Sequence, residues 1–274
     1  MARKSSPSSP WALVTGASAG IGAEFARQLA ERGYSVVLVA RRADRLQELA
    51  HYLRGRYAVD CLSVPLDLAG RDSIESLQAL LETERIEVEF LVNNAGYGVP
   101  GTFIDADWKT HADSLQVMLT GVCELTWRLL PGMQERGKGF IVNVASLAGL
   151  VPGSAKHTLY GATKAFLIRF SESLAAENMN NGVKVSALCP GFTHSEFHDV
   201  IGMQKEKEKM PSWLWMEAPE VVRYGIESVD RDEPRVVAVP GYVNQSIAAL
   251  ARKLPYGLTQ SMLRREARRW RGSD

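Results

Sequence analysis

Tyr160 and Lys164 lie four residues apart in the stretch YGATK, and Ser146 precedes the tyrosine in NVASLAG. On a helix, positions i and i+4 project from the same face, so the phenol and the ammonium are neighbours. A phenol titrates near roughly pH 10, and a nearby cation lowers that pKa toward the neutral range where general acids and bases work best. The serine hydroxyl is suited to hydrogen-bond a carbonyl oxygen that gains charge. The three residues predict proton transfer at a carbonyl or alcohol oxygen. The alternative for Tyr160 is an aromatic side chain that packs on a sheet.

A glycine-rich stretch, TGASAGIG at 15–22, follows an apolar run and opens a helical pattern. Gly16, Gly20 and Gly22 give the spacing that a pyrophosphate site needs, because one glycine turns the chain and another lets backbone N–H groups approach the anion. The N-terminus of the following helix adds a partial positive charge. The stretch predicts a dinucleotide site, with a plain turn as the alternative.

Two arginines, Arg41 and Arg42, follow the second apolar run in the sequence VARRAD. A site for NAD usually places a carboxylate at this point to hold the ribose hydroxyls. Guanidinium groups suit a 2′-phosphate, since they carry permanent charge and forked donors. The pair therefore favours NADP(H) over NAD(H), unless both arginines only cap a solvated helix.

The elements that must position these residues alternate along the chain. Apolar runs that predict buried strands stand at 11–15, 34–40, 59–64, 89–96, 139–146, 183–191 and 235–241. Helical spacing follows several of them, as in the series Ile21, Phe25, Leu29 and the series Leu46, Leu49, Leu53. Strands that are apolar throughout and followed by helices indicate a parallel sheet covered on both faces. We predict an α/β fold, a Rossmann-like doubly wound sheet of about seven strands.

Length and composition limit the possible classes. The chain has 274 residues and a formal net charge of +1, which gives no sign of a polyanionic partner such as nucleic acid. Residues 1–10 (MARKSSPSSP) are expected to form a disordered leader, not a signal peptide, and the longest apolar run is too short to cross a bilayer. Few, scattered cysteines indicate a reducing compartment, so a cytoplasmic protein is expected. We predict one oxidoreductase domain over 11–241 and a C-terminal helical extension over 242–274.

With these motifs in order, the chain resembles the short-chain dehydrogenase/reductase family from about Trp11 to Gly241. The resemblance implies catalytic roles for Ser146, Tyr160 and Lys164, with SLAG at 146–149 matching the family's Ser-x-x-Gly. It also implies cofactor contacts at Gly16, Ser18, Gly20, Ile21, Gly22, Asp67, Asn94, Ala95, Gly96, Tyr160, Lys164, Pro190, Gly191 and Thr193. A homodimer or homotetramer is the family's habit.

Met118 is the main departure from the family pattern. Many members have an asparagine in a stretch such as NLTG, whereas this chain reads MLTG, and in the family that asparagine helps to hold a water relay from the lysine. A thioether cannot replace an amide donor. Either Lys164 is re-protonated by another route, or turnover is slow, or the site binds cofactor without activity. The interval from Ser146 to Tyr160 is also one residue longer than the commonest form, which affects the loop 150–159.

Three further segments carry weaker signals. His194 and His198 are spaced like a metal pair, but no third ligand has suitable spacing, and we expect no metal. The apolar stretch MPSWLWM (210–216), within an expected substrate loop 192–217, is either a lid over an apolar substrate or ordinary packing on the body. The basic amphipathic stretch 258–271 is expected to be a surface helix of the protein or its oligomer, with contact to an anionic membrane as the less favoured alternative.

We therefore expect an NADP(H)-dependent oxidoreductase that moves a hydride between nicotinamide and a carbonyl or secondary alcohol of a hydrophobic small molecule. Tyr160 is the expected general acid and base. The competing hypothesis is a catalytically weak NADP(H)-binding protein that acts as a redox-responsive partner, which only Met118 supports.

Overall fold

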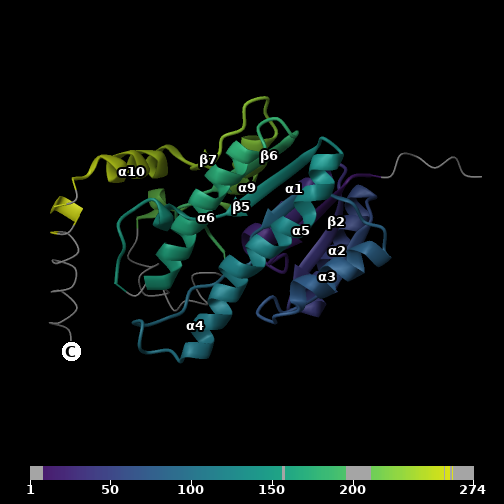
Figure 1. The fold of residues 1–274 in the computed structure, drawn as a ribbon, viewed down its shortest axis with the longest axis horizontal. Coiled ribbons are helices and arrows are strands. Elements are labelled where there is room, and N and C mark those ends of the chain that lie inside the picture. Colours follow the sequence, from purple (N-terminus) through teal and green to yellow (C-terminus); the bar gives the residue numbers. More distant parts are fainter. Residues whose placement is uncertain (1–8, 156–157, 196–210, 256, 260, 262–274) are drawn as a thin grey trace, which may run out of the picture.

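A computed structural model of the chain describes residues 9–155, 158–195, 211–255, 257–259 and 261. Within them, seven strands form one parallel sheet in the order β3-β2-β1-β4-β5-β6-β7 (Figure 1). The strands are β1 (Trp11–Thr15), β2 (Ser35–Ala40), β3 (Cys61–Pro65), β4 (Val88–Asn93), β5 (Gly139–Val144), β6 (Val183–Leu188) and β7 (Val237–Ala238). The predicted doubly wound sheet of about seven strands is confirmed.

The strand ends differ from the predicted ones. Runs expected to reach residues 96, 146 and 191 leave the sheet at Asn93, Val144 and Leu188, and β7 keeps only two residues. The apolar part of each run is buried in the sheet, as in β2, where all six residues are buried. The small polar residues after β4, β5 and β6 lie beyond the carboxyl ends of the strands, which is where parallel α/β folds bind ligands.

Helices cover both faces of the sheet (Figure 1). They are α1 (Gly20–Glu31), α2 (Ala43–Tyr57), α3 (Ser73–Thr83), α4 (Trp108–Leu115), α5 (Gly121–Glu135), α6 (Thr158–Glu177), α9 (Ala218–Val229) and α10 (Tyr242–Lys253). Buried side chains of α1, α2 and α9 make up the core on one face. Those of α3, α5 and α6 pack against the other face. No helix among the described residues is both long and apolar enough to span a bilayer.

The strand order changes direction at β1, which pairs with β2 on one side and with β4 on the other. Thr15, the last residue of β1, ties the carboxyl end of β1 to that of β4. Its Oγ1 donates to Val92 O (3.3 Å) and accepts from the backbone N–H groups of Asn94 (2.9 Å) and Ala95 (3.0 Å). A crevice opens at such a switch point, because the connections on either side lead away from each other.

A chain of polar side chains crosses the core between β4, β5 and α6. Asn93 Nδ2 donates to Asn143 Oδ1 (2.8 Å), and Asn143 Nδ2 donates to Ser171 Oγ (2.9 Å). Ser171 Oγ in turn donates to Leu167 O (2.7 Å). All three polar side chains are buried, and burial of polar groups is tolerated because each finds a partner.

The central helix is interrupted by a π-helical turn, η1 (Gln116–Thr120), between α4 and α5. A π-helical turn has i to i+5 hydrogen bonds in place of the i to i+4 bonds of an α-helix. Such turns are rare and frequently occur at functional sites. Met118 lies in this turn and is buried.

Candidate active site

One cavity of about 1040 Å³ lies at the carboxyl ends of the strands and gathers every site residue that the sequence predicts. Its lining includes the predicted residues Gly16, Ser18, Gly20, Ile21, Gly22, Arg41, Arg42, Asp67, Asn94, Ala95, Gly96, Ser146, Tyr160, Lys164, Pro190, Gly191 and Thr193. This volume reaches the upper end of the roughly 300–1,000 Å³ of small-molecule sites. The cavity is therefore large enough for a dinucleotide-sized ligand.

The glycine turn is shaped so that only glycines fit it. Gly16 (φ +66°) and Gly20 (φ +52°) adopt the left-handed region. A Cβ on Gly22 would lie 2.2 Å from Gly16 O, so a side chain there is excluded. Asn94 Nδ2 closes the turn from the neighbouring strand end by donating to Thr15 O (2.9 Å) and Gly16 O (3.3 Å). The bare backbone before α1 forms a cradle that fits a pyrophosphate.

Arg42 joins the end of β2 to the glycine turn. Its Nε and Nη2 donate to Ser18 Oγ at 3.2 and 3.1 Å, and Nη2 also approaches Ser18 O at 3.4 Å. Arg41 and Arg42 are exposed at this end of the cavity. A pre-positioned guanidinium beside a serine hydroxyl fits a phosphate ester, whose oxygens accept from both.

Ser146, Tyr160 and Lys164 meet at the other end of the cavity. Ser146 begins the short 3₁₀ turn η2 (Leu147–Gly149), and its side chain hydrogen-bonds that of Tyr160. Both Tyr160 and Lys164 belong to α6, with Lys164 Nζ 5.6 Å from the centroid of the tyrosine ring. Lys164 Nζ donates to Val144 O at 2.7 Å. A Cβ on Gly149 would lie 2.6 Å from the backbone carbon of Lys164, so this glycine lets η2 approach α6.

Burial governs the charge states of this group in the protein alone. Burial raises the pKa of Tyr160 to about 12. The hydrogen bond with Ser146 lowers this pKa, but its effect is smaller than that of burial. Burial also lowers the pKa of Lys164 to about 8, so the lysine is mostly an ammonium at neutral pH. The lowering of the tyrosine pKa that we expected from the lysine is not seen, because loss of hydration outweighs it. The tyrosine is therefore a protonated phenol at pH 7.

Met118 stands beside the lysine, as its position in the motif predicted. A Cβ on Gly96 would lie 3.3 Å from Met118 Sδ and 3.7 Å from Lys164 Nζ, so all three share one corner of the cavity. The thioether is 1 % exposed and offers no donor there.

His111 is a cavity residue that the sequence did not reveal. Its Nε2 lies 2.8 Å from Phe103 O, and its ring stacks on that of Phe103 with centroids 4.9 Å apart. Because a carbonyl only accepts, Nε2 carries the hydrogen, and Nδ1 is left buried without a partner. The only signal in the sequence is that His111 precedes Met118 by seven residues, two helical turns.

The apolar stretch after residue 210 is described over 211–216, and its last residue, Met216, is tied to the body. Met216 N donates to Phe192 O (2.9 Å), and His194 N donates to Met216 O (3.0 Å). Met216 also packs against the core. Neither Trp213 nor Trp215 belongs to the described lining of the cavity, which includes Phe192 and Thr193 instead. Met216 thus packs on the body whereas Trp213 is 65% exposed, so the choice between a lid and ordinary packing stays a prediction for this stretch.

No group of metal-ligating side chains occurs among the residues that the structure describes. His194 Nε2 lies 3.8 Å from Glu217, and His198 falls outside the described residues, as does most of the basic stretch 258–271.

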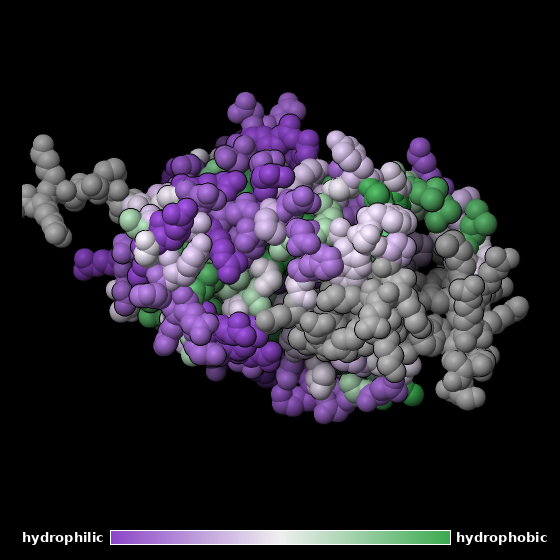
Figure 2. All heavy atoms as spheres, turned by 180° about the vertical axis from the view of Figure 1, so that it is seen from behind, coloured by the Kyte–Doolittle hydropathy of each residue, from purple (hydrophilic) through white to green (hydrophobic). Residues whose placement is uncertain are grey.

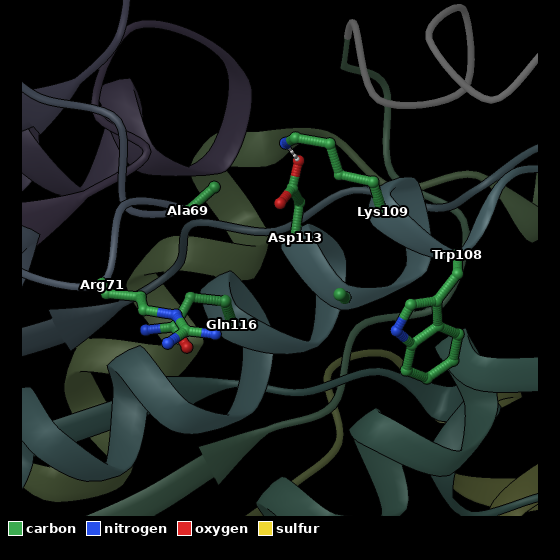
Figure 3. A pocket seen from close by; sticks show the side chains of 7 residues that line it. Ala69, Arg71, Trp108, Lys109, Asp113 and Gln116 are labelled. Carbon is green, nitrogen blue, oxygen red and sulfur yellow. Dashed lines mark hydrogen bonds and ion pairs between the residues drawn. The ribbon is translucent and has the colours of Figure 1, made fainter.

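A second hollow of about 370 Å³ lies where α4 meets the loop after β3 (Figure 3). Trp108 and Arg71 border it, and Lys109 Nζ is paired with Asp113 Oδ2 at 2.6 Å. Both Trp108 and Arg71 are exposed. Of its two lining cations, Lys109 is neutralised by Asp113 and Arg71 is exposed, so we assign no site to this hollow.

Comparison with known proteins finds relatives of this chain. The family model for short chain dehydrogenases matches residues 10–206. The very-long-chain 3-oxoacyl-CoA reductase of Anas platyrhynchos is 37% identical over 195 residues, which are 69% of this chain and 62% of that protein. Nodulation protein G of Rhizobium sp. (strain N33) is 40% identical over 200 residues, 72% of this chain and 78% of that protein. The match thus spans about three fifths of the length of the very-long-chain reductases.

Solved structures show the same fold. A short-chain dehydrogenase from Sphingobium yanoikuyae in complex with NADPH has a TM-score of 0.77 and 30% identity, covering 90% of this chain and 97% of that chain. The bulky-bulky ketone specific alcohol dehydrogenase from Comamonas testosteroni has a TM-score of 0.73 and 29% identity, covering 90% and 95%.

Proposed function

Because the chain belongs to the short-chain dehydrogenase family of oxidoreductases, we propose that it is an NADP(H)-dependent carbonyl reductase or alcohol dehydrogenase. It transfers a hydride between nicotinamide and the carbonyl carbon of an apolar small molecule, with Tyr160 as general acid and base. One observation carries the proposal: the glycine turn, the arginine pair and the Ser146–Tyr160–Lys164 group line a single cavity.

One end of the cavity would bind the phosphates of the cofactor, and the other end would carry out the proton transfer. NADPH supplies the hydride when bound, with Gly16, Gly20 and Gly22 at its pyrophosphate and Arg42 at its 2′-phosphate. Two related structures that hold NADPH support the preference for a cofactor with a 2′-phosphate. They are the Sphingobium yanoikuyae dehydrogenase and L-sorbose reductase from Gluconobacter frateurii.

In the reductive direction, the substrate carbonyl accepts hydrogen bonds from Ser146 Oγ and Tyr160 Oη. As the carbonyl carbon gains the hydride, the C=O pair moves to oxygen and takes the phenolic proton, which leaves an alcohol and a tyrosinate. The raised pKa of Tyr160, about 12, keeps this proton in place at neutral pH. The ammonium of Lys164 would then stabilise the tyrosinate until solvent returns a proton.

The substrate end of the cavity is mostly apolar. Its lining there includes Val99, Pro100, Phe103, Leu147, Val151, Pro152, Leu159 and Phe192. The names of related proteins fit such a lining, since they include very-long-chain 3-oxoacyl-CoA reductases and an alcohol dehydrogenase specific for bulky-bulky ketones. We propose a carbonyl flanked by hydrocarbon as the substrate class.

The test follows NADPH absorbance with a panel of ketones and aldehydes of increasing hydrocarbon size. Steady oxidation that is faster with NADPH than with NADH supports the proposal. Tight NADPH binding without oxidation by any substrate contradicts it.

That second outcome is what a catalytically weak, redox-responsive NADP(H)-binding protein predicts. The observation in its favour is the thioether of Met118 beside Lys164, at the point where the family has an amide. Met118→Asn separates the two functions. Turnover that rises in this variant from a measurable wild-type rate indicates an enzyme limited by proton return, whereas no turnover in either protein favours the binding role.

A homodimer or homotetramer and a cytoplasmic location are part of the proposal. Cys61, Cys123 and Cys189 are all unpaired, as a reducing compartment favours. Trp127 on α5 and Phe166 on α6 are exposed apolar side chains that a second copy would cover.

A further inference from the structure

Helix α10 presents an apolar face to solvent. Tyr242 is 89% exposed, Leu250 63% and Val243 37%. Val243 and Leu250 are seven residues apart, about two helical turns, so they lie along one side of the helix. Figure 2 shows hydrophobic residues gathered at the end of the molecule where α10 lies. Contiguous exposed apolar groups of this kind mark an interaction surface.

The opposite side of α10 is fixed to the body. Asn244 and Ala248 are buried, and Asn244 Nδ2 donates to Pro240 O at 2.9 Å. Gln245 Nε2 donates to Val239 O at 2.9 Å. The helix is therefore held so that its apolar side points outward.

The sequence that forms and follows α10 is basic. Arg252 and Lys253 are exposed in the last turn of α10. No Asp or Glu occurs in the sequence from 236 to 265, and residues 236–274 carry seven Lys or Arg against two acidic residues, a net charge of +5. The whole chain carries only +1, so the other 235 residues carry −4. Charge is thus strongly segregated along the chain.

An anionic lipid surface is the partner that fits both features. Apolar side chains on one helix face enter the boundary between headgroups and acyl chains, and cations beside them attract anionic headgroups. A protein partner or a second copy would satisfy the apolar face but gives no reason for the excess of positive charge. Nucleic acid would satisfy the charge but not the apolar face.

We propose that α10, with its exposed residues Tyr242, Val243 and Leu250 and the adjoining cations, docks the protein on the surface of anionic membranes. Ile247 lies on the same helix and lines the catalytic cavity, so docking holds the cavity mouth near the lipid. The docking surface goes beyond the proposed oxidoreductase function and does not depend on it.

Co-sedimentation of the full chain with vesicles tests the proposal. The vesicles consist of phosphatidylcholine alone or of phosphatidylcholine with about 30% phosphatidylglycerol. We expect binding to the anionic vesicles only, and release at about 0.5 M salt, where the Debye length is a few ångströms. Leu250→Asp and Arg252→Glu should each lower the partition coefficient about tenfold or more, which is the size of effect expected for a residue within the contact.

Ile104→Asp is the matched control, because Ile104 is 87% exposed but lies far from α10 in the sequence, in the loop before α4. It should sediment like the wild type. All variants should bind NADPH as the wild type does, which shows that they are folded whether or not the catalytic proposal holds.

Four results overturn the proposal. One is a wild-type protein that stays in solution with anionic vesicles at low salt, and another is equal binding by Leu250→Asp and the wild type. The third is a lower oligomeric mass of Leu250→Asp in light scattering, which assigns the face to a second copy. A duplex oligonucleotide that binds the wild type and displaces it from vesicles would instead assign the basic segment to nucleic acid.

Discussion

At the scale of single residues, the site depends on how burial sets the charge of two side chains. Lys164 is 5% exposed, and its Nζ donates to Val144 O. Tyr160 has Ser146 as its hydrogen-bond partner. Burial thus keeps the phenol protonated at pH 7, and Lys164, with its pKa lowered to about 8, is still mostly an ammonium, which suits an acid that donates its proton once hydride arrives.

The buried ammonium should cost stability in a pH-dependent way. The pKa of Lys164 is lowered from 10.5 to about 8, so the unfolded chain binds more protons between these values, and stability rises with pH across that window. We expect Lys164→Met to be more stable than the wild type at pH 7 by about 2 kcal/mol, after allowing for the lost bond to Val144 O. Urea unfolding at pH 7 to 10 measures the difference, which should shrink as pH rises.

Lys253→Met serves as the control, because Lys253 is exposed. It should show a small difference from the wild type that does not change across the window. A Lys164→Met variant that is less stable than the wild type at pH 7 would mean that the ammonium is not under desolvation strain.

Arg42 should decide the choice of dinucleotide. Arg42→Asp removes the guanidinium that Ser18 holds in place and puts a carboxylate near the 2′-phosphate. We expect the Kd for NADPH to rise more than tenfold, as loss of a charge-assisted contact predicts, while the Kd for NADH stays level or falls. Fluorescence titration measures both. Arg45→Asp, at an exposed position outside the described lining of the cavity, should change neither.

At the scale of elements, turns at strand ends and helix starts do most of the positioning. Gly22→Ala should damage the turn before α1, because the new Cβ would collide with Gly16 O. We expect loss of NADPH binding in titration calorimetry and a lower midpoint of thermal unfolding. Gly55→Ala in α2 adds a Cβ that meets no atom within 4 Å, so it should raise stability by about 0.5–1 kcal/mol and leave binding unchanged. Equal NADPH binding by the Gly22→Ala and Gly55→Ala variants would contradict the proposed role of the glycine turn in binding the pyrophosphate.

Truncation of the central residue in the polar chain through the core should cost more stability than truncation at its end. Asn143→Leu leaves the amide of Asn93 and the hydroxyl of Ser171 without the partner that joined them. We expect a loss of about 3 kcal/mol in the free energy of unfolding, against about 1 kcal/mol for Ser171→Ala at the end of the chain. Denaturant unfolding measures both losses. Equal losses would show that the network does not act through its central amide.

Much of this arrangement was predictable from the sequence, because it depends on local patterns. Strand β1 was predicted at its observed residues. The glycine turn precedes the predicted start of α1, and the spacing of Tyr160 and Lys164 in YGATK places both side chains on one face of α6. The π-turn at 116–120 was not predicted, since an extra residue in a helix leaves no mark on apolar spacing. His111 and the Asn93–Asn143 bond depend on contacts between distant segments, which periodicity does not report. The tyrosine pKa was misjudged for the same reason, because burial is a property of the whole site.

At the scale of the whole molecule, one parallel sheet with helices on both faces places all the predicted site residues along a single cavity at the β1–β4 switch point. A ligand that binds only the folded protein stabilises it by mass action. NADPH at about 100 times its Kd should therefore stabilise the protein by about 2.7 kcal/mol, a shift of a few degrees in Tm. Differential scanning calorimetry should show this shift, and the same concentration of NADH should give a smaller one. Equal shifts would contradict the preference for NADP(H).

The central claim is that Tyr160 gives the proton while the rest of the cavity holds the cofactor. Its most direct measurement compares wild type and Tyr160→Phe, with NADPH oxidation measured on the best ketone and NADPH binding measured by fluorescence. We predict that kcat falls roughly 10³-fold, within the range for loss of a general acid, while the Kd for NADPH changes less than about threefold. A variant that keeps wild-type turnover, or that loses NADPH binding together with turnover, would contradict the account.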